Sequence, residues 1–344
     1  ENTTKQIDDV TFIASKEFFI KSKIYNSISI KTYFLQDNEE LSQKYLNKTI
    51  EYITLYEKKI APFPYKEFKI VENIHQTGYS MPTFTLIGSR LLNKPYILKQ
   101  SLGHEILHQY FGNSIFNDFK QGNWVEGLTT YLADDYYKKE QGSDANSRKM
   151  ALNEYENFVN AKNEFAIKDF EHRFDKASML IGYSKLSFVF HMLERKIGSS
   201  KFEQLIKDFY SIYKFEEVNL EKLAEFFDNN TKMELKEFFN QWFNKKGQIN
   251  FNIENVNNYY DKNGFWLSFD LIQDEKNFFK FDLPVSVKTY DKQIEKTVEI
   301  TQVKQHINLN FSSEILEVNI DKIKQLNEFE IDLPFLFFIV LIIF

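Results

Sequence analysis

The sequence contains no cysteine and little glycine or proline: its 344 residues include 11 glycines and 6 prolines. The absence of cysteine excludes disulfide bonds and thiolate ligands for a metal ion, and it leaves the redox compartment open. Arginine is also scarce, so that nearly all basic charge comes from lysine, which we attribute to codon bias. Acidic and basic residues are interspersed, with a net charge of −6 and no basic stripe. We therefore expect no nucleic-acid partner.

Long apolar runs are absent as well, except at the end of the chain. Residues Leu333 to Phe344 are almost wholly apolar, but they fall short of the ~20 residues needed to span a bilayer. This tail could be a buried strand, an interfacial segment or a membrane span cut off by the end of the sequence, and we favour the last. Glu1 is not a natural start, so we expect both ends to be truncated. A membrane-associated or cell-envelope location is slightly preferred over the cytoplasm.

The most informative stretch is Gly103–Tyr131, which contains His104-Glu105-x-x-His108 and, further on, Glu126. On a helix, two histidines four residues apart project from one face, because about 3.6 residues make one turn. Two neutral imidazoles so placed can bind one divalent ion, and a carboxylate from a second helix would complete three protein ligands. The remaining open position distinguishes a catalytic zinc site from a structural one. Without its surroundings, the motif fits two histidines on an ordinary amphipathic helix equally well.

The surroundings resemble the M1 family of zinc metallopeptidases, the gluzincins related to aminopeptidase N. Those enzymes carry HExxHQ-x-x-GN and then a Trp-containing element that ends in Glu-Gly; this chain has HQYFGN at 108–113 and WVEGLTTY at 124–131. One residue fewer separates His108 from Glu126 than in the usual family pattern, a difference that the loop Ser114–Gly122 can absorb. The resemblance covers most of the chain.

The resemblance implies a metallopeptidase that holds one Zn2+ ion with His104, His108 and Glu126. A zinc-activated water would then attack the peptide bond, with Glu105 beside the metal as the general base. The segment Ile181–Lys185 resembles the family element in which a tyrosine faces the zinc.

That likeness gives Tyr183 the task of stabilising the tetrahedral oxyanion. Without the resemblance, a tyrosine near the start of a helix is more often a packing residue.

The segment Gly78–Thr83 falls where M1 aminopeptidases carry Gly-x-Met-Glu-Asn, whose glutamate binds the free amino group of the substrate. If Met81 matches the methionine of that motif, Pro82 stands where the glutamate would be, and a proline cannot pair with an ammonium group. Aminopeptidase specificity is therefore doubtful, unless Glu72 or another nearby acid replaces the glutamate. The backbone of Gly78 and Met81 would still bind an extended peptide, as an edge strand does. An ordinary entry into a strand fits this segment equally well.

Two polar residues follow Glu126 on its own helical face, namely Thr130 and Asp134. Either could accept a hydrogen bond from a ligand histidine, because metal-bound imidazoles usually donate their other N–H group. For Asp134 we expect a solvent-exposed carboxylate instead.

Periodicity predicts the remaining elements. Apolar residues at helical spacing predict helices over Asn38–Ile60, Tyr96–Phe111, Trp124–Tyr137, Met150–Asn163, Ser178–Ile197, Lys201–Tyr213, Leu220–Asn229 and Glu234–Lys245. Alternating residues predict strands over Val10–Ile13, Ile28–Tyr33 and Phe68–Val71, and a loop that feeds a strand over Gly78–Ile87. Short alternating runs typical of a small β-sandwich follow at Asn250–Ile253, Phe265–Leu271, Phe278–Leu283, Val285–Tyr290, Lys296–Ile300 and Ile315–Ile320.

The expected fold class is α+β with several domains: a thermolysin-like zinc peptidase catalytic domain, mostly helical, flanked by β-domains. Residues 1–36 would be the truncated end of an N-terminal β-domain, 37–248 the catalytic domain, 249–330 a small β-sandwich domain and 331–344 the apolar tail. The expected partner is a peptide or protein substrate, and membrane association through the tail is a further possibility. The oligomeric state stays open. The alternative function is a catalytically inactive peptidase-like scaffold for peptide binding or assembly.

Overall fold

The computed structural model describes residues 11–75 and 78–320. They form two compact units, whose described parts are 11–75, 78–144 and 165–245 in the first, and 145–164 and 246–320 in the second. Both helices and sheets are present, which confirms the α+β class. None of the helices in the described ranges is long and apolar enough to cross a membrane. The tail Leu333–Phe344 lies outside the described residues.

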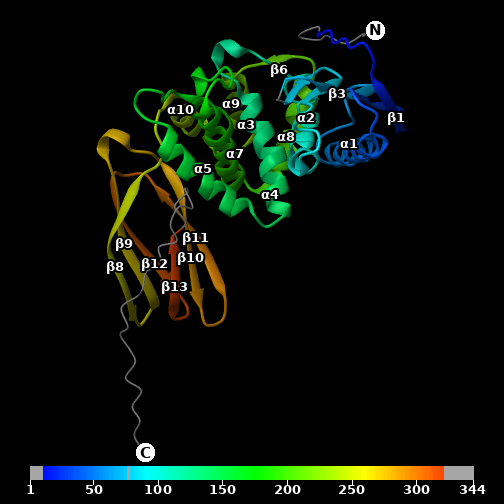
Figure 1. Ribbon diagram of the computed structural model, residues 1–344. Helices are drawn as coiled ribbons and strands as arrows, with labels where there is room; N and C mark the ends of the chain where they lie inside the picture. Colours follow the sequence, from blue (N-terminus) through cyan, green and yellow to red (C-terminus); the bar gives the residue numbers. More distant parts are fainter. Residues whose placement is uncertain (1–10, 76–77, 321–344) are drawn as a thin grey trace, which may run out of the picture. The chain divides into compact units, whose positions relative to one another are not determined.

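A five-stranded sheet with the order β1-β2-β3-β5-β4 lies in the first unit (Figure 1). Strands β2 (Ile28–Phe34), β3 (Glu67–Asn73) and β5 (Phe84–Gly88) run parallel, whereas the edge strands β1 (Phe19–Tyr25) and β4 (Gly78–Met81) are antiparallel to their neighbours. The first four residues of the predicted loop at 78–87 are thus a strand of their own. The strand predicted over Val10–Ile13 is wrong for residues 11–13, which have no regular structure, and Val10 lies outside the described residues.

Helix α1 (Glu39–Lys59) packs on this sheet, with the ring of Tyr45 against that of Phe34. Asn38 caps the helix by accepting a hydrogen bond from the backbone N–H of Leu41, a common role of asparagine before a helix. Three tyrosines of α1 donate hydroxyl hydrogen bonds of 2.7–2.9 Å to backbone carbonyls that lead into the metal motif: Tyr45 to Leu92, Tyr52 to Leu98 and Tyr56 to Gly103. Helix α1 therefore fixes the approach to the motif helix.

The rest of the first unit is mainly helical. Its helices are α2 (Leu102–Leu107), α3 (Trp124–Thr129), α4 (Tyr136–Glu140), α6 (Lys176–Met179), α7 (Leu186–Ile197), α8 (Ser199–Tyr213), α9 (Leu220–Asn230) and α10 (Lys236–Asn244), with the short parallel pair β6 (Phe116–Asn117) and β7 (Glu217–Val218). Turns of π-helix precede α2, follow α3 and precede α7, at Ile97–Ser101, Thr130–Asp135 and Leu180–Lys185. The continuous α-helices predicted over Tyr96–Phe111 and Trp124–Tyr137 are therefore wrong in detail. Such π-helical turns occur frequently at functional sites.

The second unit contains α5 (Asp144–Phe158) and two three-stranded antiparallel sheets. One sheet has the order β12-β9-β8 and the other β11-β10-β13, with strands β8 (Phe251–Asp261), β9 (Gly264–Gln273), β10 (Phe281–Thr289), β11 (Gln293–Ile300), β12 (Lys304–Phe311) and β13 (Ile315–Ile320). The rings of Phe251 and Phe281 stack between the sheets, with centroids 5.7 Å apart. Two predicted runs on either side of Pro284 form the single strand β10, and β12 is a strand that periodicity did not predict.

Candidate metal centre

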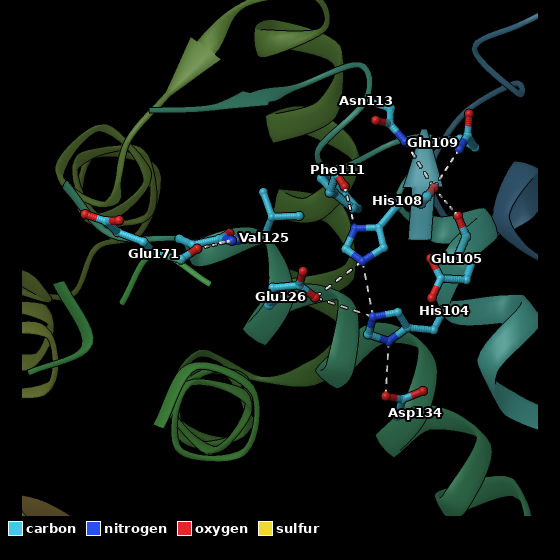
Figure 2. Close-up of polar contacts among 12 residues, drawn as sticks. His104, Glu105, His108, Gln109, Phe111, Asn113, Val125, Glu126, Asp134 and Glu171 are labelled. Atoms are coloured by element: carbon cyan, nitrogen blue, oxygen red, sulfur yellow. Dashed lines mark hydrogen bonds and ion pairs between the residues drawn. The ribbon is translucent and has the colours of Figure 1, made fainter. Parts of the chain in front are cut away.

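Two helices of the first unit bring the motif histidines and Glu126 together (Figure 2). His104 and His108 belong to α2 and its C-terminal end, and Glu126 lies in the first turn of α3. The Nε2 atoms of the two histidines are 3.2 Å apart, and they lie 3.6 Å and 3.4 Å from Oε2 of Glu126. The three side chains are only 12%, 11% and 21% exposed, respectively. These are the residues that the sequence predicts as metal ligands.

The second ring nitrogen of each histidine has an oxygen partner. Nδ1 of His104 lies 3.1 Å from Oδ2 of Asp134, and Nδ1 of His108 lies 3.1 Å from the carbonyl oxygen of Phe111. A carboxylate and a carbonyl can only accept, so each imidazole in its neutral form would carry its proton on Nδ1. The Nε2 lone pairs of both rings then face the same point.

Asp134 is thus a partner of a ligand histidine, and the prediction that it would be solvent-exposed is wrong. Its side chain is 16% exposed. A carboxylate in this position fixes the orientation of the imidazole and raises its basicity as a ligand. Thr130, the other candidate, has a buried hydroxyl that forms no hydrogen bond within the described part of the chain.

The carboxylates of Glu105, Glu126 and Asp134 lie near the two imidazoles and give the site an excess of negative charge. Burial would lower the pKa of the His104 imidazole, but Asp134 and the other acids outweigh burial and raise that pKa well above its ordinary value. Burial would likewise raise the pKa of Glu126, yet the two histidines hold it well below its ordinary range. The site therefore favours positive charge, which a divalent cation would supply.

The donor set fits such a cation. Tetrahedral coordination with bonds of about 2.0–2.1 Å places neighbouring ligand atoms about 3.3–3.4 Å apart. The observed separations of 3.2, 3.4 and 3.6 Å bracket that value. In addition, Oε2 of Glu126 is buried and accepts no hydrogen bond within the described residues, a deficit that a metal ion would remove. Two imidazoles and one carboxylate are a common ligand set of catalytic zinc.

Glu105 lies between the histidines and the edge strand β4. A Cβ atom added to Gly78 would lie 2.8 Å from Oε1 of Glu105. The backbone carbonyl of Glu105 accepts a 2.8 Å hydrogen bond from the hydroxyl of Ser80. Burial raises the pKa of the Glu105 carboxyl group, and the histidines oppose that shift. A raised carboxyl pKa suits a group that must take up a proton and release it again.

The two residues predicted to bind substrate lie on opposite faces of β4, because side chains alternate along a strand. Gly78 is on the face of Ser80, towards Glu105. Met81 is on the other face, where its sulfur accepts a hydrogen bond from the Thr11 hydroxyl over 3.5 Å.

Tyr183 approaches the site from the π-helical turn Leu180–Lys185. Its ring stacks with that of His104, with centroids 6.5 Å apart and an interplanar angle of 13°. Burial and the nearby carboxylates raise the pKa of the Tyr183 hydroxyl, so the phenol stays protonated and can donate a hydrogen bond. Leu186, which directly follows this turn, packs closely against Gly127 of α3. Only glycine fits there, because a Cβ atom at residue 127 would lie 2.2 Å from Cγ of Leu186.

Asn123 links the segments that carry Glu126 and Tyr183, a role that sequence reasoning missed. Its side-chain oxygen caps α3 by accepting from Val125 N–H at 3.1 Å, and its amide donates to the Glu171 carbonyl at 3.0 Å. Its backbone N–H donates to the Phe170 carbonyl at 2.6 Å, and the Phe170 ring packs 5.9 Å from that of Tyr183. Asparagine before a helix is a recognisable capping signal, but its contacts with 170–171 are not visible in the sequence.

The chain is similar in sequence to known peptidases. A family model described as the Peptidase family M1 domain matches residues 45–242. Leucine aminopeptidase 2 of Aspergillus fumigatus is 25% identical over 247 residues, which is 64% of this chain and 39% of that protein. Leucine aminopeptidase 2 of Candida albicans is 24% identical over 215 residues, 54% of this chain and 34% of that protein.

A third relative covers more of this chain at lower identity. Aminopeptidase 2, mitochondrial, of Saccharomyces cerevisiae is 21% identical over 275 residues, 72% of this chain and 28% of that protein. In each of these three comparisons, the match spans less than two fifths of the relative's length.

Proposed function

Because this chain belongs to peptidase family M1, we propose that it is a zinc-dependent metallopeptidase that hydrolyses peptide bonds. The observation that carries the proposal is the convergence of His104, His108 and Glu126, whose ligand atoms all lie within 4.8 Å of one another. The buried Oε2 of Glu126, which accepts no hydrogen bond within the described residues, supports it further. One zinc ion held by these three residues would leave a coordination position for water or substrate.

The proposed division of labour follows from the positions of the side chains. His104, His108 and Glu126 would hold the zinc ion, which would supply Lewis-acid charge to acidify a water molecule and to polarise the substrate carbonyl. Glu105 takes a proton from the attacking water and passes it to the leaving amine, as a carboxylate beside the site can. Tyr183 donates its phenolic hydrogen to the oxygen on which negative charge develops. Asp134 keeps the ring of His104 in the orientation and tautomer that binding requires.

The substrate is proposed to be an extended peptide that lies along edge strand β4, past the backbone of Gly78 and Met81. The named relatives are aminopeptidases, but we propose that this chain does not depend on a free N-terminus. Pro82 at the β4–β5 turn offers no charge to an ammonium group. Glu72 is already engaged, because its Oε2 accepts a 2.7 Å hydrogen bond from the N–H of Leu35.

Hydrolysis of a fluorogenic peptide panel tests the proposal. The peptides should have free and acetylated N-termini, and each should be assayed after chelation and again after zinc is restored. We expect hydrolysis that chelation abolishes and zinc restores. Glu105→Gln is the matched control, because it should keep stoichiometric zinc and lose most hydrolysis.

The alternative, an inactive scaffold that binds peptides or assembles with partners, gives a different result. A scaffold would hydrolyse none of the peptides whether or not zinc is present. Hydrolysis that persists unchanged in Glu105→Gln would also overturn the assignment of the base.

A further inference from the structure

The hairpin that carries β4 turns at Pro82 and Thr83, because Met81 pairs directly with Phe84. Thr83 adopts a φ of +74°, in the left-handed region that β-branched residues rarely occupy. A turn with proline first and a positive φ second favours glycine at the second position. The backbone at Thr83 is therefore strained, and such strain persists only where surrounding groups hold it.

Gln109, which directly follows the second ligand histidine, holds this turn. Its side chain is fully buried. Oε1 accepts from the Thr83 N–H at 2.8 Å, while Nε2 donates to the Met81 carbonyl at 3.0 Å and to the Ser80 hydroxyl at 2.8 Å. Both amide hydrogens and the carbonyl oxygen of one side chain thus bind three residues of the hairpin.

Ser80 continues the connection to the motif helix. Its hydroxyl donates to the Glu105 carbonyl at 2.8 Å and accepts from the side-chain amides of Gln109 and Asn113, the latter at 3.1 Å. A hydroxyl has one hydrogen to donate and two lone pairs, and all are used here. The strand is therefore tied both to the residue that acts as the base and to the residue that follows the metal motif.

We propose that Gln109 is a positioning residue, which holds edge strand β4 in register with α2 and so keeps the peptide-binding edge at a fixed distance from Glu105. The inference rests on the proposed function, because a strand edge fixed beside the base serves a site that takes an extended peptide. Gln109 acts through the hairpin and not on the substrate itself. The strain at Thr83 makes the hairpin dependent on Gln109.

The test compares Gln109→Met, which keeps the length of the side chain and removes its hydrogen bonds, with the wild-type chain. Hydrogen exchange of fragments that cover 78–87 should accelerate about tenfold, since a local opening loses hydrogen-bond stabilisation. Fragments of α3 and of the second unit should exchange as before, and zinc content should not change. Gln204→Met, at an exposed glutamine of α8, is the matched control and should change none of these rates.

Thr83→Gly separates the strain from simple loss of contacts. Glycine takes a positive φ without penalty, so the exchange effect of Gln109→Met should be at least about threefold smaller in a Thr83→Gly background. Kinetics give a second readout: KM for a peptide long enough to follow β4 should rise about tenfold in Gln109→Met, with kcat within about threefold of wild type. A structural role alone would lower active-enzyme content and leave KM unchanged.

The possible failures are distinguishable. Unaltered exchange of 78–87 in Gln109→Met, or a wild-type KM together with accelerated exchange, overturns the inference. Equal effects of Gln109→Met in the wild-type chain and in the Thr83→Gly background overturn the part that strain plays. A wild-type chain that hydrolyses no peptide overturns the proposed function. The hydrogen-exchange comparison would then still show whether Gln109 holds the hairpin.

Discussion

Replacement of Gly78 by alanine should reduce turnover without loss of zinc. The added Cβ atom would lie 2.8 Å from Oε1 and 3.5 Å from the carboxyl carbon of Glu105. The first distance is several tenths of an ångström shorter than ordinary van der Waals contact, so the carboxylate or β4 must move. The Glu105 backbone cannot retreat easily, because the Ser80 hydroxyl binds its carbonyl. The carboxylate itself must therefore rotate away from its position.

A displacement of about 1 Å in a catalytic group costs up to about 10²-fold in rate. For Gly78→Ala we expect kcat to fall about 10- to 100-fold, which raises the activation free energy by about 1.4–2.7 kcal/mol. Gly78 is exposed and its φ is not in the left-handed region, so the variant should fold normally.

The assay measures kcat, zinc per chain and melting temperature together. Tyr79→Ala is the matched control on the same strand, because Tyr79 is 54% exposed and lies on the opposite face. It should keep the wild-type kcat. A wild-type kcat in Gly78→Ala, with folding intact, would refute the placement of Glu105 against β4.

Four further outcomes are expected. Glu126→Gln should lower zinc below about one per chain in metal analysis, because it removes the only anionic ligand; full retention of zinc would contradict the ligand set. Asp134→Asn should weaken zinc binding about 10- to 100-fold in a competition titration with a chelator, and an unchanged affinity would make its contact incidental. Tyr183→Phe should keep zinc and fold but lose about 10²–10³ in kcat; wild-type rates would make Tyr183 a packing residue. Matched peptides with free and acetylated N-termini should be hydrolysed at similar rates, because Pro82 offers no charge to the free amine. A preference of about 10²-fold for the free amine that persists in Glu72→Gln would refute that interpretation.

The parts of this chain that local rules govern could be predicted from the sequence. The two histidines share a helix face because of their spacing. Helix α1 (Glu39–Lys59) lies within the predicted range Asn38–Ile60 because apolar residues recur there at helical spacing. Residues 220–230 form a helix and residues 315–320 form a strand, both close to the predicted bounds, because their apolar residues recur at helical and alternating spacing, respectively. Apolar periodicity suffices where an element is long and packs on one side only.

Features that depend on contacts between distant segments could not be predicted. The His104–Asp134 pair needs two helices to meet, and nothing in the 130–135 sequence marks the π-helical turn that carries Asp134. Strand β12 was not predicted because its sequence, KQHINLNF, has only three apolar residues, and of these only Ile307 and Phe311 are buried. A proline normally interrupts a strand, but Pro284 lies inside the pairing of β10 with β11, opposite Thr297.

The order of the site residues along the chain separates two stages of assembly. All three proposed metal ligands lie within 104–126, so that their convergence closes one short loop at small entropic cost. Between that stretch and Tyr183, the chain leaves the first compact unit at residue 144 and returns to it at 165. Tyr183, the proposed donor to the oxyanion, therefore depends on a longer closure, which the contacts of Asn123 with residues 170 and 171 support. Because the shorter loop costs less entropy to close, we expect the three proposed ligands to converge during folding before Tyr183 joins them.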